Sequence, residues 1–224
     1  MTRHDKKFTR FITCEGGEGS GKSTLIQKLN TALEQQGYEV VLTREPGGSP
    51  LGNQIRSWLL SHDPNIRIGN KSELLLFLAA RAQHLEELVL PALNSGKVVL
   101  CDRFQDSTIV YQGIARGLGL DYVQKLCTLA CDGIQPGLTL FLDVDPSVGL
   151  KRAKRVRKTD TANGETDRIE SETLEFHERV RQGFLTLAEK EPDRFYRIDA
   201  MQSPEVVFSE ALKAVEQCLT RFST

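Results

Sequence analysis

Short apolar stretches alternate with longer amphipathic ones along most of this chain. The short stretches are rich in β-favouring residues and predict strands at residues 8–14, 38–43, 97–101, 138–144 and 195–199. The longer ones carry leucine, isoleucine and valine at helical spacing and predict helices at 22–36, 51–61, 72–95, from 146 into a basic stretch, at 173–190 and at 204–222, with two more between 106 and 132. This alternation predicts an α/β fold with a five-stranded parallel sheet and helices on both faces.

Polar residues follow four of the predicted strands directly. They are the segments from Glu15 to Ser23, Arg44-Glu45, Asp102-Arg103 and the aspartates at 143 and 145. Parallel strands bring their carboxyl ends to one edge of a sheet, where ligands bind in folds of this kind. We therefore expect these groups to surround one cleft, within a single domain over residues 1–224.

The composition of the chain argues against nucleic acid and membranes as partners and against a disulfide-bonded protein. The formal net charge of the chain is -1, so no global field recruits nucleic acid or an anionic membrane. The five cysteines are scattered and odd in number, which favours buried thiols over a disulfide framework. Residues 1–10 are polar and no apolar run reaches the length of a membrane span, so we expect a cytoplasmic protein.

Residues 16–23, with the sequence Gly-Gly-Glu-Gly-Ser-Gly-Lys-Ser, match the P-loop pattern G-x-x-x-x-G-K-[ST] between a predicted strand and a predicted helix. Glycines let backbone N–H groups converge on phosphate oxygens, Lys22 neutralises the β- and γ-phosphates, and the Ser23 hydroxyl suits Mg²⁺. A plain strand-to-helix turn is the alternative, and the flanking elements argue against it. The predicted ATP site comprises Gly16, Gly17, Glu18, Gly19, Ser20, Gly21, Lys22, Ser23 and Thr24.

A P-loop fixes the triphosphate and leaves the acceptor open. The chain lacks the Asn-Lys-x-Asp sequence expected of a guanine-specific protein, and it is short for a self-assembling ATPase. Arginines recur after strands and in helices expected to face the cleft, namely Arg44, Arg56, Arg81 and Arg103. Planar guanidinium groups grip phosphate in a bidentate manner, which predicts a phosphotransferase whose acceptor itself carries a phosphate.

Several sequence blocks in order make the chain similar to the bacterial thymidylate kinases, which phosphorylate dTMP to dTDP with ATP. The blocks are 11–24, Thr-Arg-Glu-Pro-Gly-Gly at 43–48, Leu-Phe-Leu-Ala-Ala-Arg at 76–81, Cys-Asp-Arg-Phe at 101–104, Asp-Ser-Thr at 106–108, Tyr-Gln-Gly at 111–113, Leu-Phe-Leu-Asp-Val at 140–144 and Asp-Arg-Ile-Glu at 167–170. The resemblance covers roughly residues 8–202 and implies a P-loop NTPase fold with a mobile lid, Mg²⁺ as cofactor, and a homodimer.

The resemblance also implies roles for individual residues. The implied dTMP site comprises Arg44, Glu45, Arg56, Phe77, Arg81, Arg103, Thr108, Tyr111 and Gln112. Arginines at 44, 56 and 103 would hold the acceptor phosphate, Phe77 would stack on thymine, and Arg81 and Gln112 would meet its polar edge. Tyr111 would crowd the sugar 2′ position, and Asp102 would help Ser23 to hold Mg²⁺.

Each role has a plainer alternative on the residues alone. Phe77 lies on an apolar helix stripe and is compatible with simple core packing, as is Tyr111. Arg56 and Arg81 are compatible with solvated helix positions, and Glu45 with an ordinary turn charge. Phe104 stands where this family commonly has Tyr or His, so a hydrogen bond is lost there while packing should survive.

Residues 151–158 carry six basic side chains in eight positions, which is compatible with a solvated helix face or a nucleic-acid patch. The resemblance identifies a lid at about 151–168 that closes over ATP. Because Ser20 replaces a basic residue in the P-loop, the resemblance implies that the catalytic arginine comes from this lid, with Arg155 or Arg157 as the candidates and Arg168 as a further one. The adenine site is weakly signalled, and residues 199–203 are a guess from the fold.

The predicted reaction is in-line transfer from MgATP to dTMP, with Lys22, Arg103, Arg155 and Arg157 as the catalytic residues. A kinase for dUMP, dCMP or AMP is the nearest alternative. A P-loop binding module without transfer activity, and a nucleic-acid binder using residues 151–158, are alternatives from other classes. The predicted partners are therefore ATP, dTMP and a second copy of the chain, with no nucleic acid and no membrane.

Overall fold

The structure is a computed structural model that describes residues 6–61, 63, 65–159, 168–169 and 171–220. Within those ranges, no helix combines the length and the apolar character that crossing a bilayer demands.

A five-stranded sheet forms the centre of the molecule, with strand order β2-β3-β1-β4-β5 and every neighbouring pair parallel. The strands are β1 (Lys6–Gly16), β2 (Val40–Arg44), β3 (Val98–Asp102), β4 (Ile134–Asp143) and β5 (Phe195–Asp199). The predicted fold class is confirmed. Two strands are longer than predicted, since β1 continues to Gly16 and β4 begins at Ile134.

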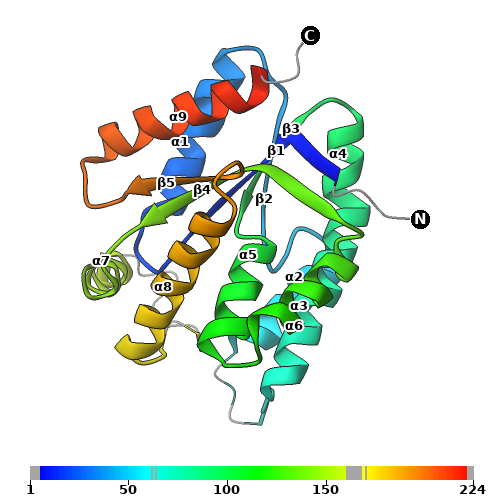
Figure 1. Cartoon of the computed structure of the whole chain (residues 1–224), viewed down its shortest axis with the longest axis vertical. Coiled ribbons are helices and arrows are strands. Elements are labelled where there is room, and N and C mark those ends of the chain that lie inside the picture. The colour runs from blue at the N-terminus through cyan, green and yellow to red at the C-terminus, as the bar shows by residue number, and fades with distance from the viewer. Residues whose placement is uncertain (1–5, 62, 64, 160–167, 170, 221–224) are drawn as a thin grey trace.

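Helices cover both faces of the sheet, as Figure 1 shows. One face packs against α1 (Lys22–Gln35) and α9 (Pro204–Thr220), where Ile12 and Cys14 share a core with both helices. The opposite face carries α8 (Leu174–Lys190) and the helices between residues 70 and 130, and it buries Phe11 and Phe141. Neighbouring residues of β1 thus point to opposite faces and both are buried, as a doubly covered parallel sheet requires.

Two helical regions differ from the prediction. The helix predicted at 72–95 is α3 (Asn70–His84), a π-helical segment η1 (Leu85–Val89) and α4 (Leu90–Asn94). The segment between 106 and 132 is α5 (Gln105–Thr108), a second π-helical segment η2 (Ile109–Ala115) and α6 (Leu120–Ala130). The remaining helices are α2 (Pro50–Leu60) and α7 (Pro146–Thr159).

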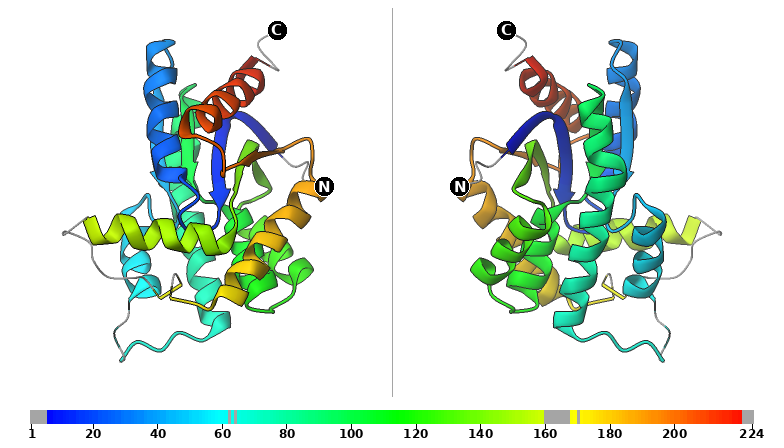
Figure 2. Two further views of the ribbon diagram at one scale, coloured as in Figure 1. Left: turned by 90° about the vertical axis from the view of Figure 1, so that its left-hand side faces the viewer. Right: turned by 90° about the vertical axis from the view of Figure 1, so that its right-hand side faces the viewer.

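The turn from β1 into α1 depends on glycine. Gly19 and Gly21 have φ of 64° and 92°, a left-handed conformation that a Cβ atom disfavours. The loop therefore folds tightly and places the amino end of α1 at the carboxyl edge of the sheet. Figure 2 shows α7 lying across this same edge.

Candidate active site

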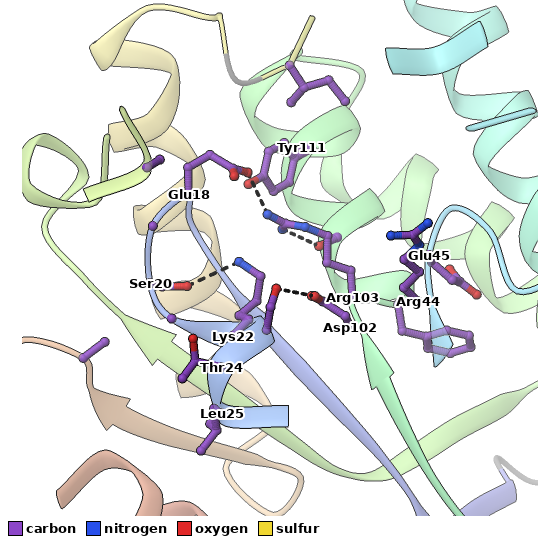
Figure 3. Close-up of a pocket in the computed structure, with 18 of the residues that line it drawn as sticks. Glu18, Ser20, Lys22, Thr24, Leu25, Arg44, Glu45, Asp102, Arg103 and Tyr111 are labelled. Carbon is purple, nitrogen blue, oxygen red and sulfur yellow. Dashed lines mark hydrogen bonds and ion pairs between the residues drawn. The ribbon is translucent and has the colours of Figure 1, made fainter. Parts of the chain in front are cut away.

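A cleft of about 820 Å³ opens at the carboxyl edge of the sheet. It brings together most of the residues that the sequence predicted for the site, and Figure 3 shows ten of its lining residues labelled. The predicted residues in its lining are Glu18, Gly19, Ser20, Gly21, Lys22, Ser23, Thr24, Arg44, Glu45, Arg56, Phe77, Arg81, Asp102, Arg103, Thr108, Tyr111, Gln112 and Arg155. Gly16, the last residue of β1, and Gly17, the next residue, do not line the cleft. The side chain of Arg157 lies outside the described part of the structure.

Lys22 is folded back onto its own loop. Its Nζ donates to the carbonyl oxygens of Gly16 at 3.0 Å and Gly17 at 2.9 Å, and to Ser20 Oγ at 3.3 Å. Burial lowers the pKa of Lys22, and the positive charge of Arg103 lowers it further, although three nearby carboxylates oppose this. The surroundings thus do not fully stabilise the positive charge of Lys22, and an anion bound beside it would do so.

Ser23, in the first turn of α1, and Asp102, at the end of β3, bring two oxygen-bearing side chains together. Ser23 Oγ donates to Asp102 Oδ2 at 3.3 Å. The other carboxylate oxygen, Oδ1, is buried and makes no hydrogen bond with any residue that the structure describes. Such an atom is costly to bury unless it gains a partner, and hydroxyl and carboxylate oxygens are what Mg²⁺ binds. The two residues therefore fit Mg²⁺, and they would hold it through their hydroxyl and carboxylate oxygens.

Arg103 points toward the P-loop. Its Nη2 contacts Glu18 Oε1 at 2.8 Å, and its Nη1 donates to the Gly16 carbonyl oxygen and to Ser107 Oγ, both at 3.1 Å. The guanidinium group lies over the ring of Tyr111 at 5.2 Å. Its backbone has φ of 67°, which is uncommon for a residue other than glycine and often marks a functional position.

Glu15 lies beneath this arrangement and was not among the residues predicted for the site. Its Oε1 accepts from the Phe104 amide at 2.8 Å, and its Oε2 accepts from Ser107 Oγ at 2.6 Å. Burial raises the pKa of Glu15 to about 7 and Asp106 adds to the rise, against the opposing effect of Arg103. An acidic residue in a buried strand directly before the P-loop was the available signal.

A buried ion-pair network lies at the opposite end of the cleft. Arg81 Nε contacts Glu45 Oε2 at 2.7 Å, Arg81 Nη2 donates to Thr108 Oγ1 at 2.8 Å, and His84 Nδ1 is 3.0 Å from Glu45 Oε1. Arg81 is only 1% exposed, so the solvated alternative for it is wrong. Glu45 is likewise buried, so it is no ordinary turn charge. No sequence signal pointed to His84 as a partner of Glu45.

The remaining predicted acceptor residues line the space between these two ends. Phe77 is half-buried, Arg44 is exposed, and Arg56 Nη1 donates to the Pro46 carbonyl oxygen at 3.0 Å. Gln112 is buried and donates to Glu73. Tyr111 packs edge-on against Phe176 and Phe184, and its hydroxyl oxygen is buried with no hydrogen-bond partner in the described part of the chain. Phe77 thus lines the cleft and also packs against a small core cluster that contains Ile55 and Leu59.

The basic stretch begins inside the cleft. Arg155 is exposed and lines it, while Arg152 Nη1 donates to the Ala200 carbonyl oxygen at 2.8 Å. Arg168 contacts Glu73 instead, at the acceptor end. Phe104 keeps its packing as expected, with its ring edge-on to Phe11 at 5.0 Å.

The lining also includes residues on the α9 side of the cleft. Two of them, Ala200 and Gln202, fall within the guessed adenine segment 199–203. Others had no sequence signal, because they are ordinary residues of α1 and α9 that only the fold brings here: Leu25, Lys28, Pro204 and Val207.

Comparison with known proteins identifies the family of this chain. The family described as Thymidylate kinase matches residues 14–211. A protein of Protochlamydia amoebophila named thymidylate kinase is 58% identical over 207 residues, which are 92% of each chain. One of Desulfovibrio desulfuricans is 50% identical over 94% of this chain and 97% of its own. The crystal structure of thymidylate kinase from Ehrlichia chaffeensis superposes with a TM-score of 0.71 at 35% identity and covers 92% of this chain and 97% of its own. The chain therefore belongs to the thymidylate kinase family.

Proposed function

We propose that this chain transfers the terminal phosphoryl group of MgATP to dTMP, forming dTDP and ADP. One observation carries the proposal: Lys22 Nζ and Arg103 Nη1 both donate to the carbonyl oxygen of Gly16. The cation expected to hold the donor phosphates and the cation expected to hold the acceptor phosphate thus meet at one atom of the P-loop. Family membership supports dTMP as the acceptor.

The proposed chemistry is alignment and charge neutralisation. The acceptor phosphate oxygen is already anionic, so no strong general base is needed. Mg²⁺, held by Ser23 and Asp102, would supply positive charge beside the β- and γ-phosphates. Lys22 leaves its loop carbonyls for the triphosphate, and Arg103 exchanges Glu18 for the acceptor phosphate, because each gains a more strongly charged partner.

A lid arginine completes the proposed site. Arg155 lines the cleft, so the basic stretch is expected to serve the triphosphate and not nucleic acid. Arg157 is the second candidate, in a lid of about residues 151–168 within a single domain. Closing this lid would exclude water and so limit wasteful hydrolysis of ATP.

We further propose a cytoplasmic homodimer. All five cysteines are buried thiols, which suits a reducing compartment. Large apolar side chains stay exposed on neighbouring helices, with Leu75 60% and Leu129 72% exposed. Light scattering on the purified protein tests the dimer, and a monomer at micromolar concentration would contradict it.

A coupled ADP-release assay tests the reaction, with MgATP and a panel of dTMP, dUMP, dCMP and AMP. Arg103→Ala should lower kcat/KM for dTMP by about 100-fold or more, since it removes transition-state charge stabilisation. Phe77→Ala should raise the KM for dTMP by about tenfold through lost stacking. Arg179→Ala is the matched control, because Arg179 forms an exposed pair with Glu175 outside the cleft. Folded wild-type protein that made no dTDP would refute the proposed function.

A further inference from the structure

Glu73 is a buried carboxylate that the proposed reaction does not use. It lies in the first turn of α3 with 0% exposure. Its Oε1 accepts from Gln112 Nε2 at 2.8 Å and from Arg116 Nε at 3.3 Å, and its Oε2 accepts from Arg168 Nη2. One of these partners, Gln112, lines the cleft, so Glu73 lies directly behind the site.

Glu73 can only accept hydrogen bonds in this environment. Burial raises the pKa of its carboxyl group, but the hydrogen bonds from Gln112 and Arg168 and the charge of Arg116 outweigh burial and leave the pKa below its ordinary value. The group is therefore ionised at neutral pH, and an ionised carboxylate has no proton to donate. A neutral carboxyl group at the same place could either donate to Gln112 or accept from it. The two arginines keep Glu73 ionised, so that it can only accept.

An acceptor-only partner decides which way the Gln112 amide points. A glutamine amide has an NH₂ end and an oxygen end of nearly the same shape. Only the NH₂ end can bond to an ionised carboxylate, so Gln112 must turn it toward Glu73. With the NH₂ end held at Glu73, the amide oxygen is the acceptor that Gln112 can offer to a ligand, beside the second N–H of the amide.

Arg81 supplies the complementary donor at the same end of the cleft. It also lines the cleft, and a guanidinium group carries five N–H donors and no acceptor. Nε, Nη1 and Nη2 each donate once within the protein, to Glu45, Cys127 and Thr108, so one N–H on each Nη remains for a ligand. The cleft thus offers a donor from Arg81 and an acceptor from Gln112. Thymine presents the matching pair, a carbonyl oxygen at C4 beside the N–H at N3. Cytosine presents the reverse, an amino group at C4 beside an unprotonated N3.

We propose that Glu73 is a positioning residue for pyrimidine recognition, which fixes the Gln112 amide so that it accepts from the N3–H of thymine and disfavours cytosine. This inference rests on the proposed function and adds the residue that sets the polarity of base recognition. Arg116 and Arg168 keep Glu73 ionised. Arg168 is itself held by Leu59, whose carbonyl oxygen accepts from Arg168 Nε at 3.2 Å.

The test is the ratio of kcat/KM for dTMP to kcat/KM for dCMP. Glu73→Gln introduces a residue that can donate as well as accept, so Gln112 can turn either way. The ratio should fall by at least about tenfold, the factor that corresponds to one net hydrogen bond of about 1.4 kcal/mol. The KM for ATP should stay unchanged. A purely structural role would lower the Tm and leave the ratio unmoved.

Asp106→Asn is the matched control. Asp106 is also a fully buried carboxylate bound to an arginine, with Arg194 Nη1 at 2.7 Å, but it does not line the cleft. It should lower the Tm and keep the ratio. Glu73→Asp retains the charge on a shorter side chain and should lower the ratio by a smaller factor. It decides the question if Glu73→Gln does not fold.

A double substitution shows whether Glu73 acts through Gln112. Gln112→Met removes the amide at similar length, and adding Glu73→Gln to it should lower the ratio no further. An equal fall in both backgrounds, or an unchanged ratio in the single variants, would overturn the proposal for Glu73. Wild-type protein that does not phosphorylate dTMP would instead refute the proposed function, so the two failures are distinguishable.

Discussion

Arg103 shows how one residue can serve two purposes in this cleft. Its left-handed backbone turns the chain after β3, and its side chain returns to the P-loop. A chain of two hydrogen bonds holds the side chain in place: Arg103 donates to Ser107, and Ser107 donates to Glu15. A strained backbone persists only where surrounding contacts determine it, and here the contacts come from three different segments.

Glu15 makes stability depend on pH in a predictable direction. Its pKa is about 7 in the folded protein, compared with an ordinary value of 4.5. Between these values the folded protein keeps a proton that the unfolded chain has released, so the free energy of unfolding falls as the pH rises through this range. Glu15→Gln removes this titration. The Tm of wild type should therefore fall relative to that of Glu15→Gln between about pH 4.5 and about pH 7.

Differential scanning calorimetry of both proteins across this range gives the measurement. Asp106→Asn removes the neighbouring carboxylate that helps to raise the pKa of Glu15, so it should make this fall in Tm shallower. Parallel Tm curves for wild type and Glu15→Gln would show that Glu15 titrates normally.

At the scale of elements, the seating of α7 on the P-loop depends on glycine. A Cβ atom on Gly149 would lie 2.2 Å from the carbonyl oxygen of Glu18, and one on Gly19 would lie 2.0 Å from the carbonyl oxygen of Gly149. The two backbones therefore touch directly. Since α7 carries Arg152 and Arg155, this contact sets where the basic stretch stands relative to the phosphates.

Gly149→Ala should thus impair the reaction although alanine favours helices over glycine by about 1 kcal/mol. The backbone oxygen cannot yield easily, so α7 must move away. We expect kcat/KM for ATP to fall by about 100-fold, as for a displacement of about 1 Å of a catalytic group. Steady-state kinetics measure this. Gly69→Ala is the control, because a Cβ there meets nothing within 4 Å. Unimpaired kinetics in Gly149→Ala would mean that α7 tolerates the shift.

Elements differ in how far the sequence could predict them. The strands were predictable because burial on both faces produces short apolar runs, and β5 matches its predicted bounds of 195–199. The π-helical segments η1 and η2 were not, since five to seven residues are too few to distinguish their period from that of an α-helix. Yet η2 carries Tyr111 and Gln112 into the cleft, so this irregularity shapes the site.

The candidate site was also predictable only in part. The P-loop was predictable because its residues are contiguous. The pairs Glu45–Arg81 and Glu73–Gln112 join residues far apart in the chain, and only the packed fold shows that their charges and amides are matched. A sequence read alone shows which groups reach the cleft edge, but not which of them bind each other.

For the whole molecule, charge is distributed unevenly in a way that the total conceals. The formal net charge is -1, yet the lining of the cleft holds eight cationic side chains and three carboxylates. The cations are Lys22, Lys28, Arg44, Arg56, Arg81, Arg103, Arg152 and Arg155, and the carboxylates are Glu18, Glu45 and Asp102. An excess of positive charge in a concave site attracts anionic nucleotides before they make contact.

This excess predicts that salt weakens binding more than it slows the chemical step. Raising KCl shortens the Debye length from about 10 Å at 0.1 M toward about 3 Å at 1 M, which screens the approach of both nucleotides but acts less on charges inside a closed site. Between about 0.1 and about 0.5 M KCl, the KM values for ATP and dTMP should rise by about fivefold, with little change in kcat.

Two variants test whether the charge of the cleft is responsible. Arg44→Gln should make the salt dependence of the KM for dTMP shallower, because Arg44 is an exposed cation of the lining. Lys190→Gln should not, because Lys190 is exposed outside the cleft. A fall in kcat at constant KM would instead place the effect of salt on the chemical step or on lid movement, and the cleft's positive field would then have no part in capturing substrate.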